Sequence, residues 1–177
     1  MAEQDVAGLV TAALKALIGE AVSGAIRGAT ASAMHPAAAT GPGANLYLFQ
    51  LGINRTGFRE PLGIRITDAL PAAQPQQLDF LYLLSGHGDA QSLEAQQCLW
   101  AGVQALEKHP VLPAADILAR AGRGKETANF GQATVKLERF DLDQLCNLWV
   151  ALQARMAPSV IYRVTVEVFA AGESRPG

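Results

Sequence analysis

The first apolar pattern along the chain lies between Val6 and Ile26. Large apolar residues recur there at spacings of three and four, and alanines lie between them. The large residues are Leu9, Val10, Leu14, Leu17, Ile18 and Val22. This is the period of an α-helix that buries one face, so we expect an N-terminal helix within residues 1–27. Lys15 and Glu20 interrupt the run, whereas a membrane span needs about 18 or more nearly uncharged residues. We therefore interpret the segment as a helix of a soluble protein.

Two later segments have the pattern of buried strands. Residues 45–51 have apolar side chains at both odd and even positions, as in a central strand that is covered on both faces. Residues 77–84 form the second strand, with one face made of Leu78, Phe80, Tyr82 and Leu84, and the turn-forming residues 85–89 are expected to end it. The intervening segment, residues 52–77, is rich in arginine, glycine and proline and predicts a long excursion with a short strand near residues 62–66.

The second half of the chain predicts another helix, a short helical turn and a strand. The helix is expected over residues 90–108, with an apolar stripe of Leu93, Cys98 or Leu99, Trp100, Val103 and Leu106. A short turn near Ile117 and a polar glycine-containing loop over residues 122–131 follow. The strand is expected over residues 133–139, with Val135 and Leu137 facing inward.

The last helix and strand have the clearest local signals. Asp141 precedes Gln144 by three residues, which is the spacing of a capping box, and Phe140 can pack onto Leu145 as a hydrophobic staple. The predicted helix face contains Leu142, Leu145, Trp149, Leu152 and Met156, and Pro158 is expected to stop the helix. A strongly alternating strand then follows over residues 160–169.

This order of elements predicts an α/β fold of α+β-like character. We expect a mixed sheet of about four main strands flanked by about three helices. The chain is interpreted as a single domain over residues 1–177. It divides into the N-terminal helix over 1–27, a flexible connector over 28–44, an α/β core over 45–169 and a disordered tail over 170–177.

The amino-acid composition suggests that part of the protein's apolar surface is covered by a partner protein. Hydrophobic residues make up 50% of the chain and charged residues only 17%, against roughly 25% charged in an average soluble domain. Some of that apolar surface is therefore expected outside the core, where it usually belongs to an interface. A net charge of −2 gives no basic field for nucleic acid or anionic lipid. The two cysteines, Cys98 and Cys146, are expected to be buried free thiols in a reducing cytosol.

No pattern in the sequence assembles a catalytic or metal site. The three histidines lie in separate loops, and only the pair His87 and Asp89 has a spacing close to that of metal ligands. The motif Gly86-His-Gly88 between a strand and a helix faintly resembles a phosphate loop but is better explained as a turn. Asp141 and Asp143 are better explained by helix capping than as an acid pair, and Gly122 to Lys125 as a solvated loop. We therefore predict no enzymatic activity and no cofactor.

Three ordered blocks of the sequence resemble a known family. They are the strand from Asn45 to Arg55, the segment from Leu78 through Leu84 to Pro113, and the segment from Leu148 to Val164 with its Pro158-Ser159 corner. Together they resemble the tail-terminator or cap proteins of phage-tail-like contractile injection systems. The resemblance implies a hexameric ring of copies of this chain at the distal end of the inner tube and sheath, where it stops polymerisation.

The implied partners are copies of this chain, an inner tube protein and a sheath protein, with no nucleic acid and no membrane. The particle is expected to assemble in the cytoplasm. We place the interface on the excursion that carries Asn54, Arg55 and Arg59. Two alternatives stay open. One is a sheath-adjacent or baseplate adaptor of a similar particle, and the other is a small cytosolic enzyme or ligand-binding domain with its site at residues 85–89.

Overall fold

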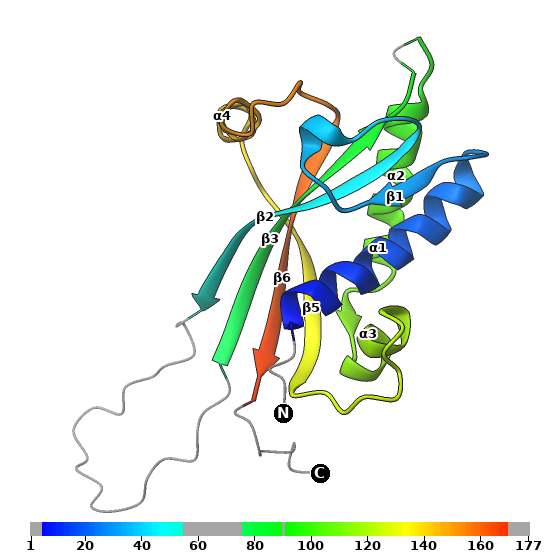
Figure 1. Ribbon diagram of the computed structural model, residues 1–177. Helices are drawn as coiled ribbons and strands as arrows, with labels where there is room; N and C mark the ends of the chain where they lie inside the picture. Colours follow the sequence, from blue (N-terminus) through cyan, green and yellow to red (C-terminus); the bar gives the residue numbers. More distant parts are fainter. Residues whose placement is uncertain (1–4, 55–75, 90, 170–177) are drawn as a thin grey trace, which may run out of the picture.

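The computed structural model describes residues 5–54, 76–89 and 91–169 (Figure 1). The elements follow in the order α1 (Val6–Ala25), β1 (Thr30–Ser32), the 3-10 helix η1 (Pro36–Ala38), β2 (Gly43–Asn54), β3 (Gln76–His87), α2 (Glu94–Glu107), β4 (Val111–Leu112), α3 (Ala114–Arg120), β5 (Phe130–Glu138), α4 (Leu142–Ala151) and β6 (Ser159–Val168). The predicted α+β-like character is confirmed.

The strands form one six-stranded mixed sheet in the order β1-β2-β3-β6-β5-β4. β1 runs parallel to β2, and the other neighbouring pairs are antiparallel. The last strand therefore lies at the centre, where Tyr162 of β6 stands opposite Tyr82 of β3. The four long strands match the four expected main strands, and the two additional strands are short ones at the edges.

Helices α1, α2 and α3 cover one face of this sheet (Figure 1). The long helix α1 buries seven side chains there, among them Val10, Leu14 and Ile18, and these pack with Phe80, Tyr82 and Leu84 of β3. α1 is also the one described helix that is long and apolar enough to cross a membrane. Its buried face packs as a core helix, because the same apolar residues that suit a lipid environment here meet the sheet and α2.

Helix α4 lies on the opposite face, near one end of the sheet (Figure 1). Side chains alternate between the two faces of a strand, so Leu83 and Ile161 point away from the core beneath α1. Together with Trp149 of α4 they form a second, small apolar cluster. Farther along this face the sheet carries polar residues, including Asp79, Arg163 and Thr165.

The segment 28–44 is not an unpacked connector. It contains β1 and η1, and it is fastened to the sheet by Asn45, whose side chain is fully buried. The Asn45 amide oxygen accepts hydrogen bonds from Ser32 Oγ (2.8 Å) and the Met34 N–H (3.1 Å), and its amide nitrogen donates to the Met34 carbonyl (2.9 Å). The segment was expected to be a connector because it lacks apolar periodicity. Polar contacts with Asn45 hold it against the sheet instead. The remaining expected divisions of the chain stay predictions.

Two element boundaries differ from expectation near the end of β3. Residues 85–87 continue the strand instead of ending it, because β2 begins at Gly43 and its first residues pair with Ser85 and His87. Helix α2 begins at Glu94 and not at residue 90, because the Asp89 side chain accepts a hydrogen bond from the Gln91 N–H in a turn. The short strand expected near residues 62–66 lies outside the described residues.

Five large apolar side chains that were expected on the buried faces of the helices and of β5 are exposed: Leu93, Trp100, Leu137, Leu142 and Met156. Trp100 is 62% exposed, because the buried face of α2 consists mainly of small residues, Cys98, Ala101, Gly102 and Ala105, together with Leu106. Leu137 lies on β5 beyond the two residues that pair with the short strand β4, and it is also exposed. Met156 follows the end of α4, which ends at Ala151 well before Pro158.

Candidate assembly surfaces

The predicted interface residues lie where β2 leaves the sheet. Asn54 is the last residue of β2 and stands opposite Gln77 of β3. Arg55 and Arg59 lie outside the described residues, so their grouping with Asn54 stays a prediction. The structure therefore places only the start of the excursion, at the open end of the β2–β3 pair.

Apolar side chains are exposed on this end of β2. Leu51 and Ile53 are both more than half exposed and share the helix-covered face with their cross-strand partners Phe80 and Leu78. Phe80 is fully buried, whereas the neighbouring β2 positions are not. Apolar residues at both odd and even positions predict a strand that is covered on both faces. The exposed end of β2 differs from this prediction, because the sequence pattern of a strand does not indicate how far a helix extends across the sheet.

Helix α2 presents a second exposed surface, the α2 stripe. It consists of Leu93, Gln97, Trp100 and Gln104, which recur at spacings of three and four on one side of the helix. All four are exposed and none is charged. Large apolar and aromatic residues in surroundings poor in charge are typical of the centre of protein–protein interfaces.

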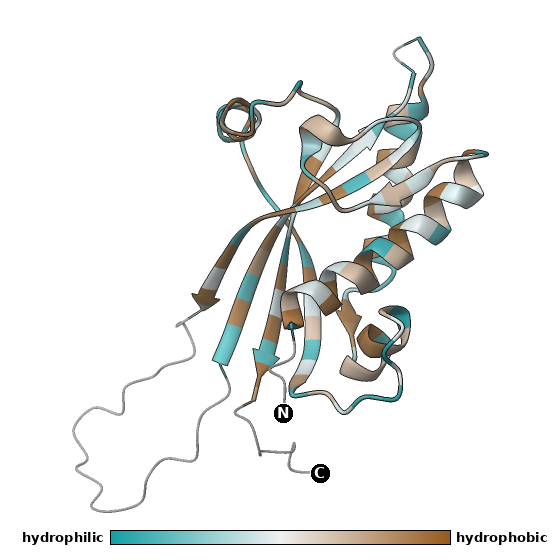
Figure 2. Ribbon diagram, viewed as in Figure 1, coloured by the Kyte–Doolittle hydropathy of each residue, from teal (hydrophilic) through white to brown (hydrophobic). Residues whose placement is uncertain are grey.

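Helix α4 presents a third surface, the α4 stripe, on the other side of the sheet. It consists of Leu142, Cys146 and Val150, of which Val150 is 75% exposed. Figure 2 shows most of α4 in the colour of hydrophobic residues, although Trp149 is its one buried residue. The α2 and α4 stripes thus lie on helices that cover opposite faces of the sheet.

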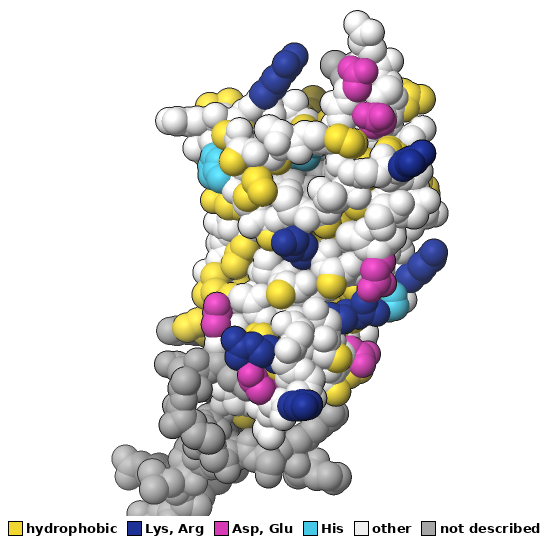
Figure 3. Space-filling view, turned by 45° about the vertical axis from the view of Figure 1, so that its right-hand side comes forward, with side chains coloured by type: hydrophobic (Ala, Val, Ile, Leu, Met, Phe, Trp, Pro, Cys, Tyr) yellow, Lys and Arg dark blue, Asp and Glu magenta, His cyan; other side chains and the backbone are white. Residues whose placement is uncertain are grey.

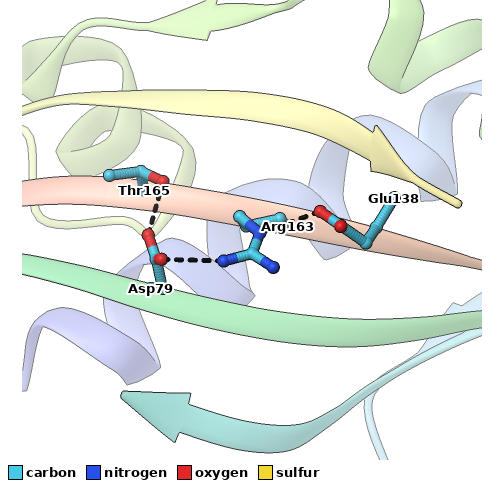
Figure 4. Close-up of polar contacts among 4 residues, drawn as sticks. All are labelled: Asp79, Glu138, Arg163 and Thr165. Atoms are coloured by element: carbon cyan, nitrogen blue, oxygen red, sulfur yellow. Dashed lines mark hydrogen bonds and ion pairs between the residues drawn. The ribbon is translucent and has the colours of Figure 1, made fainter. Parts of the chain in front are cut away.

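The polar part of the sheet face is an internally paired ion network (Figure 4). Arg163 of β6 donates from Nε to Glu138 of β5 (2.8 Å) and from Nη1 to Asp79 of β3 (3.0 Å), and Thr165 donates to Asp79 (2.6 Å). The Asp79 side chain is only 12% exposed. Hydrogen bonding to Glu138, and then to Asp79, raises the pKa of Arg163. Because the Arg163 guanidinium bridges carboxylates on the strands to either side of β6, the network ties β3, β6 and β5 together.

The pair Ser85 and His87 does not form a nucleophile and base that a substrate can reach. Ser85 Oγ and His87 Nε2 are 2.9 Å apart, and burial lowers the pKa of His87. Ser85 is fully buried, and no carboxylate among the described residues is hydrogen-bonded to the other ring nitrogen. The hollow beside His87, lined also by Thr30, Ser32 and Met34, has a volume of only about 90 Å³, which is room for a few water molecules.

The glycines of Gly86-His-Gly88 serve packing. A Cβ atom at residue 86 would overlap the Ala95 carbonyl oxygen, so glycine allows β3 to pass directly beneath the start of α2. The Glu94 carboxylate already accepts a hydrogen bond from the Asp89 N–H (3.1 Å) at this helix N-terminus. A phosphate there would meet a negative charge, which favours the interpretation of the motif as a turn.

The remaining candidate groups have structural partners. Asp141 and Gln144 form the predicted capping box, with bonds of 2.7 and 3.1 Å. In the 122–131 loop Arg123 pairs with Glu126 at 2.7 Å. No cluster of three or more His, Cys, Asp or Glu residues suited to a metal occurs in the described part of the chain. Figure 3 shows charged side chains scattered over the face in view, with no continuous basic patch among the residues drawn in colour.

Both cysteines are free, and they differ in exposure. Cys98 is buried beneath α2, where burial raises the pKa of its thiol, as expected for an inert core cysteine. Cys146 is partly exposed on α4, so the expectation of two buried thiols is wrong for this residue.

Comparison with known proteins gives a family and two similar folds. The sequence matches the family model of the Pvc16 N-terminal domain over residues 9–176. The fold is similar to the PVC sheath/tube terminator of an extracellular contractile injection system in its extended state, with a TM-score of 0.56, 16% identity, and coverage of 100% of this chain and 62% of that chain. It is also similar to the tube-terminating cap of the anti-feeding prophage, with a TM-score of 0.52, 19% identity, and coverage of 98% of this chain and 57% of that chain. No curated protein matches the sequence significantly.

The chain spans less than two thirds of the length of either similar structure. At these identities the two likenesses establish a shared fold, while the family match extends over nearly the whole sequence. The resemblance to terminators of contractile injection systems is therefore confirmed, and the chain belongs to the Pvc16 N-terminal domain family.

Proposed function

We propose that this chain is a structural terminator of a contractile injection system. In this proposal it caps the distal end of the inner tube and sheath, acts without catalysis and ends polymerisation by offering no surface to a further ring. The observation that carries the proposal is the family match over residues 9–176, together with the fold shared with a sheath/tube terminator and a tube-terminating cap.

The exposed apolar surfaces support a homo-oligomeric ring. Identical subunits that join head to tail use two different surfaces, and the contact closes into a ring when the rotation between neighbours is suitable. The α2 stripe and the α4 stripe are two such surfaces, because they differ in residues and lie on opposite faces of the sheet. The proposed ring is a hexamer that assembles in the cytoplasm and becomes part of the particle.

Mass measurement and imaging test this function together. Light scattering of the purified chain is expected to give a species of about six times 18.6 kDa. Electron microscopy of gold-labelled protein is expected to place the label at the distal end. A strict monomer that never decorates tube ends overturns the proposal, and label at the baseplate end supports the adaptor alternative instead.

The proposed α2 contact has a matched pair of variants. Trp100→Asp introduces a charge at the centre of the α2 stripe, whereas Ala12→Asp introduces the same charge at an exposed position in the middle of α1. We expect Trp100→Asp to weaken self-association at least tenfold and Ala12→Asp to leave it nearly unchanged, measured by sedimentation. Equal effects of the two variants would exclude Trp100 as an interface residue.

The proposed contact through Asn54, Arg55 and Arg59 is tested by charge reversal. We expect Arg55→Glu with Arg59→Glu to impair capping, because each change replaces an attraction to a partner by a repulsion. Particle length, measured by electron microscopy, would then increase and vary more widely. Arg155→Glu, at an exposed position after α4, is the matched control. Unchanged length and capping in the double variant would remove this contact from the proposal.

A further inference from the structure

Helix α4 is attached to the rest of the protein through few contacts. Of its ten residues only Trp149 is buried, whereas α1 buries seven. Trp149 packs on Leu83 and Ile161, in a cluster separate from the core on the other face, and the partly buried Leu145 and Leu148 of α4 pack against the same cluster. Its indole N–H donates to Ser159 Oγ (3.1 Å), which is the one side-chain hydrogen bond between α4 and the sheet among the described residues.

The hydrogen bonds of α4 and its ends are otherwise internal. The capping box closes its N-terminus. At its C-terminus the Gln153 N–H donates to the Val150 carbonyl and the Ala154 N–H to the Trp149 carbonyl, while Gln153 adopts a left-handed conformation with φ of 50°. The chain next joins the sheet at Pro158, whose carbonyl accepts from the Gly86 N–H at 2.9 Å. None of these backbone hydrogen bonds joins residues 142–154 to the sheet, and a ten-residue helix that has left the sheet is too short to stay folded by itself, so its amides exchange when it opens.

We infer that α4 opens as a unit, that is, it detaches from the sheet as one segment, and that the contacts of Trp149 are the main ones that hold it in place. Opening breaks the small Trp149 cluster and the bond to Ser159, and it leaves the core beneath α1, α2 and α3 intact. It also exposes the apolar side chains of the sheet that lie beneath α4, which are Leu83, Ile161, Tyr47 and Phe49. Such a local opening costs less free energy than global unfolding, because it exposes only a small part of the buried apolar surface.

Hydrogen exchange of the full chain, followed by mass spectrometry, tests this inference. We expect amides of residues 142–151 to exchange at least tenfold faster than amides of β3 and β6. Trp149→Ala is expected to accelerate exchange in α4 at least another tenfold while exchange in β3 stays unchanged. Asn147→Ala, at an exposed position of the same helix outside the α4 stripe, is the control and is expected to change neither rate. Equal acceleration in α4 and β3, or α4 amides that exchange only as slowly as the sheet, would overturn the inference.

Fluorescence provides a second test that leaves Trp149 in place. Trp100→Phe leaves Trp149 as the remaining tryptophan, since the chain has two. In a urea titration we expect the Trp149 emission to change at lower urea than the circular dichroism of the whole protein, because α4 opens before the sheet unfolds. Coincident transitions would mean that α4 and the sheet unfold together, which contradicts the inference. Both tests are made on monomeric protein, because the α4 stripe is a proposed ring contact, and each can fail while the capping function holds.

Discussion

At the scale of single residues, small side chains decide where elements approach one another. Gly86 lets β3 pass under the Ala95 carbonyl, and Gly102 lets α2 lie close to β3, where an added Cβ would be 3.3 Å from Leu84 Cδ2. Of the stripe expected for α2, Cys98 and Leu106 are buried, whereas Leu93 and Trp100 are exposed, because Ala101, Gly102 and Ala105 make up the rest of the buried face.

The close approach at Gly86 predicts a large cost for an added methyl group. Gly86→Ala should lower the free energy of unfolding by about 1–3 kcal/mol, because the start of α2 must move away from β3. Gly52→Ala is the control, since a Cβ there meets nothing within 4 Å, and it should change stability by less than about 0.5 kcal/mol. Urea unfolding measures both, and equal costs would contradict the packing role of Gly86.

Buried tyrosines predict a loss of stability at high pH. Burial raises the pKa of Tyr82 to about 12 despite its 2.8 Å hydrogen bond to Thr11. In the unfolded chain a tyrosine loses its proton near pH 10, so between about pH 10 and 12 the unfolded state binds fewer protons than the native state. The free energy of unfolding should therefore fall as pH rises through this range, by up to about 1.4 kcal/mol per pH unit from Tyr82.

The variant Tyr82→Phe tests the source of that slope. It removes the ionisable group and should make the loss of stability between pH 10 and 12 shallower in urea unfolding. Part of the slope should remain, because burial and the hydrogen bond to Glu107 also raise the pKa of Tyr162. A slope identical to that of the unsubstituted protein would show that Tyr82 ionises equally easily in both states.

At the scale of elements, local signals and tertiary contacts differ in what they determine. The capping box of α4 is purely local, because both of its residues lie within one helical turn, and it forms as predicted. β1 has no such local signal. It exists because Asn45, from the next strand, satisfies the polar groups of Ser32 and Met34.

The cap of α4 predicts a measurable contribution to helix stability. Asp141→Ala removes the acceptor for the Gln144 N–H and should destabilise α4 by about 1 kcal/mol. If α4 opens as a unit, this loss appears as an approximately fivefold increase in exchange of α4 amides, with little change in β3. Asp143→Ala, which removes only a first-turn charge, should have a smaller effect. A larger effect of Asp143→Ala would contradict the capping role.

At the scale of the whole molecule, α1 is part of the core and not an appendage. α1 supplies fully buried side chains to the face of the sheet that also carries α2. Since most of the exposed large apolar side chains lie at α2, at α4 and at the end of β2, the apolar excess of the composition is divided mainly between this core and three separate surfaces.

The position of α1 predicts that the whole domain depends on it. Ile18→Ala should destabilise the protein by about 2–5 kcal/mol, because it opens a cavity between α1, α2 and β3. Lys15→Ala, on the exposed side of the same helix, should stay within about 0.5 kcal/mol. Thermal and urea unfolding provide the measurement. A cost for Ile18→Ala as small as that for Lys15→Ala would place α1 outside the cooperative core.

The sequence by itself determined the long strands, the N-terminal helix, the capped helix α4 and the family. Those features depend on periodicity, on residues a few positions apart, or on ordered blocks that survive in a linear comparison. Only the tertiary structure decided that β6 lies between β3 and β5, that Arg163 joins Asp79 and Glu138 across three strands, and that Trp100 is exposed while Trp149 is buried. The physical reason is that burial depends on what packs against a side chain, and the partners here come from segments far apart in the chain.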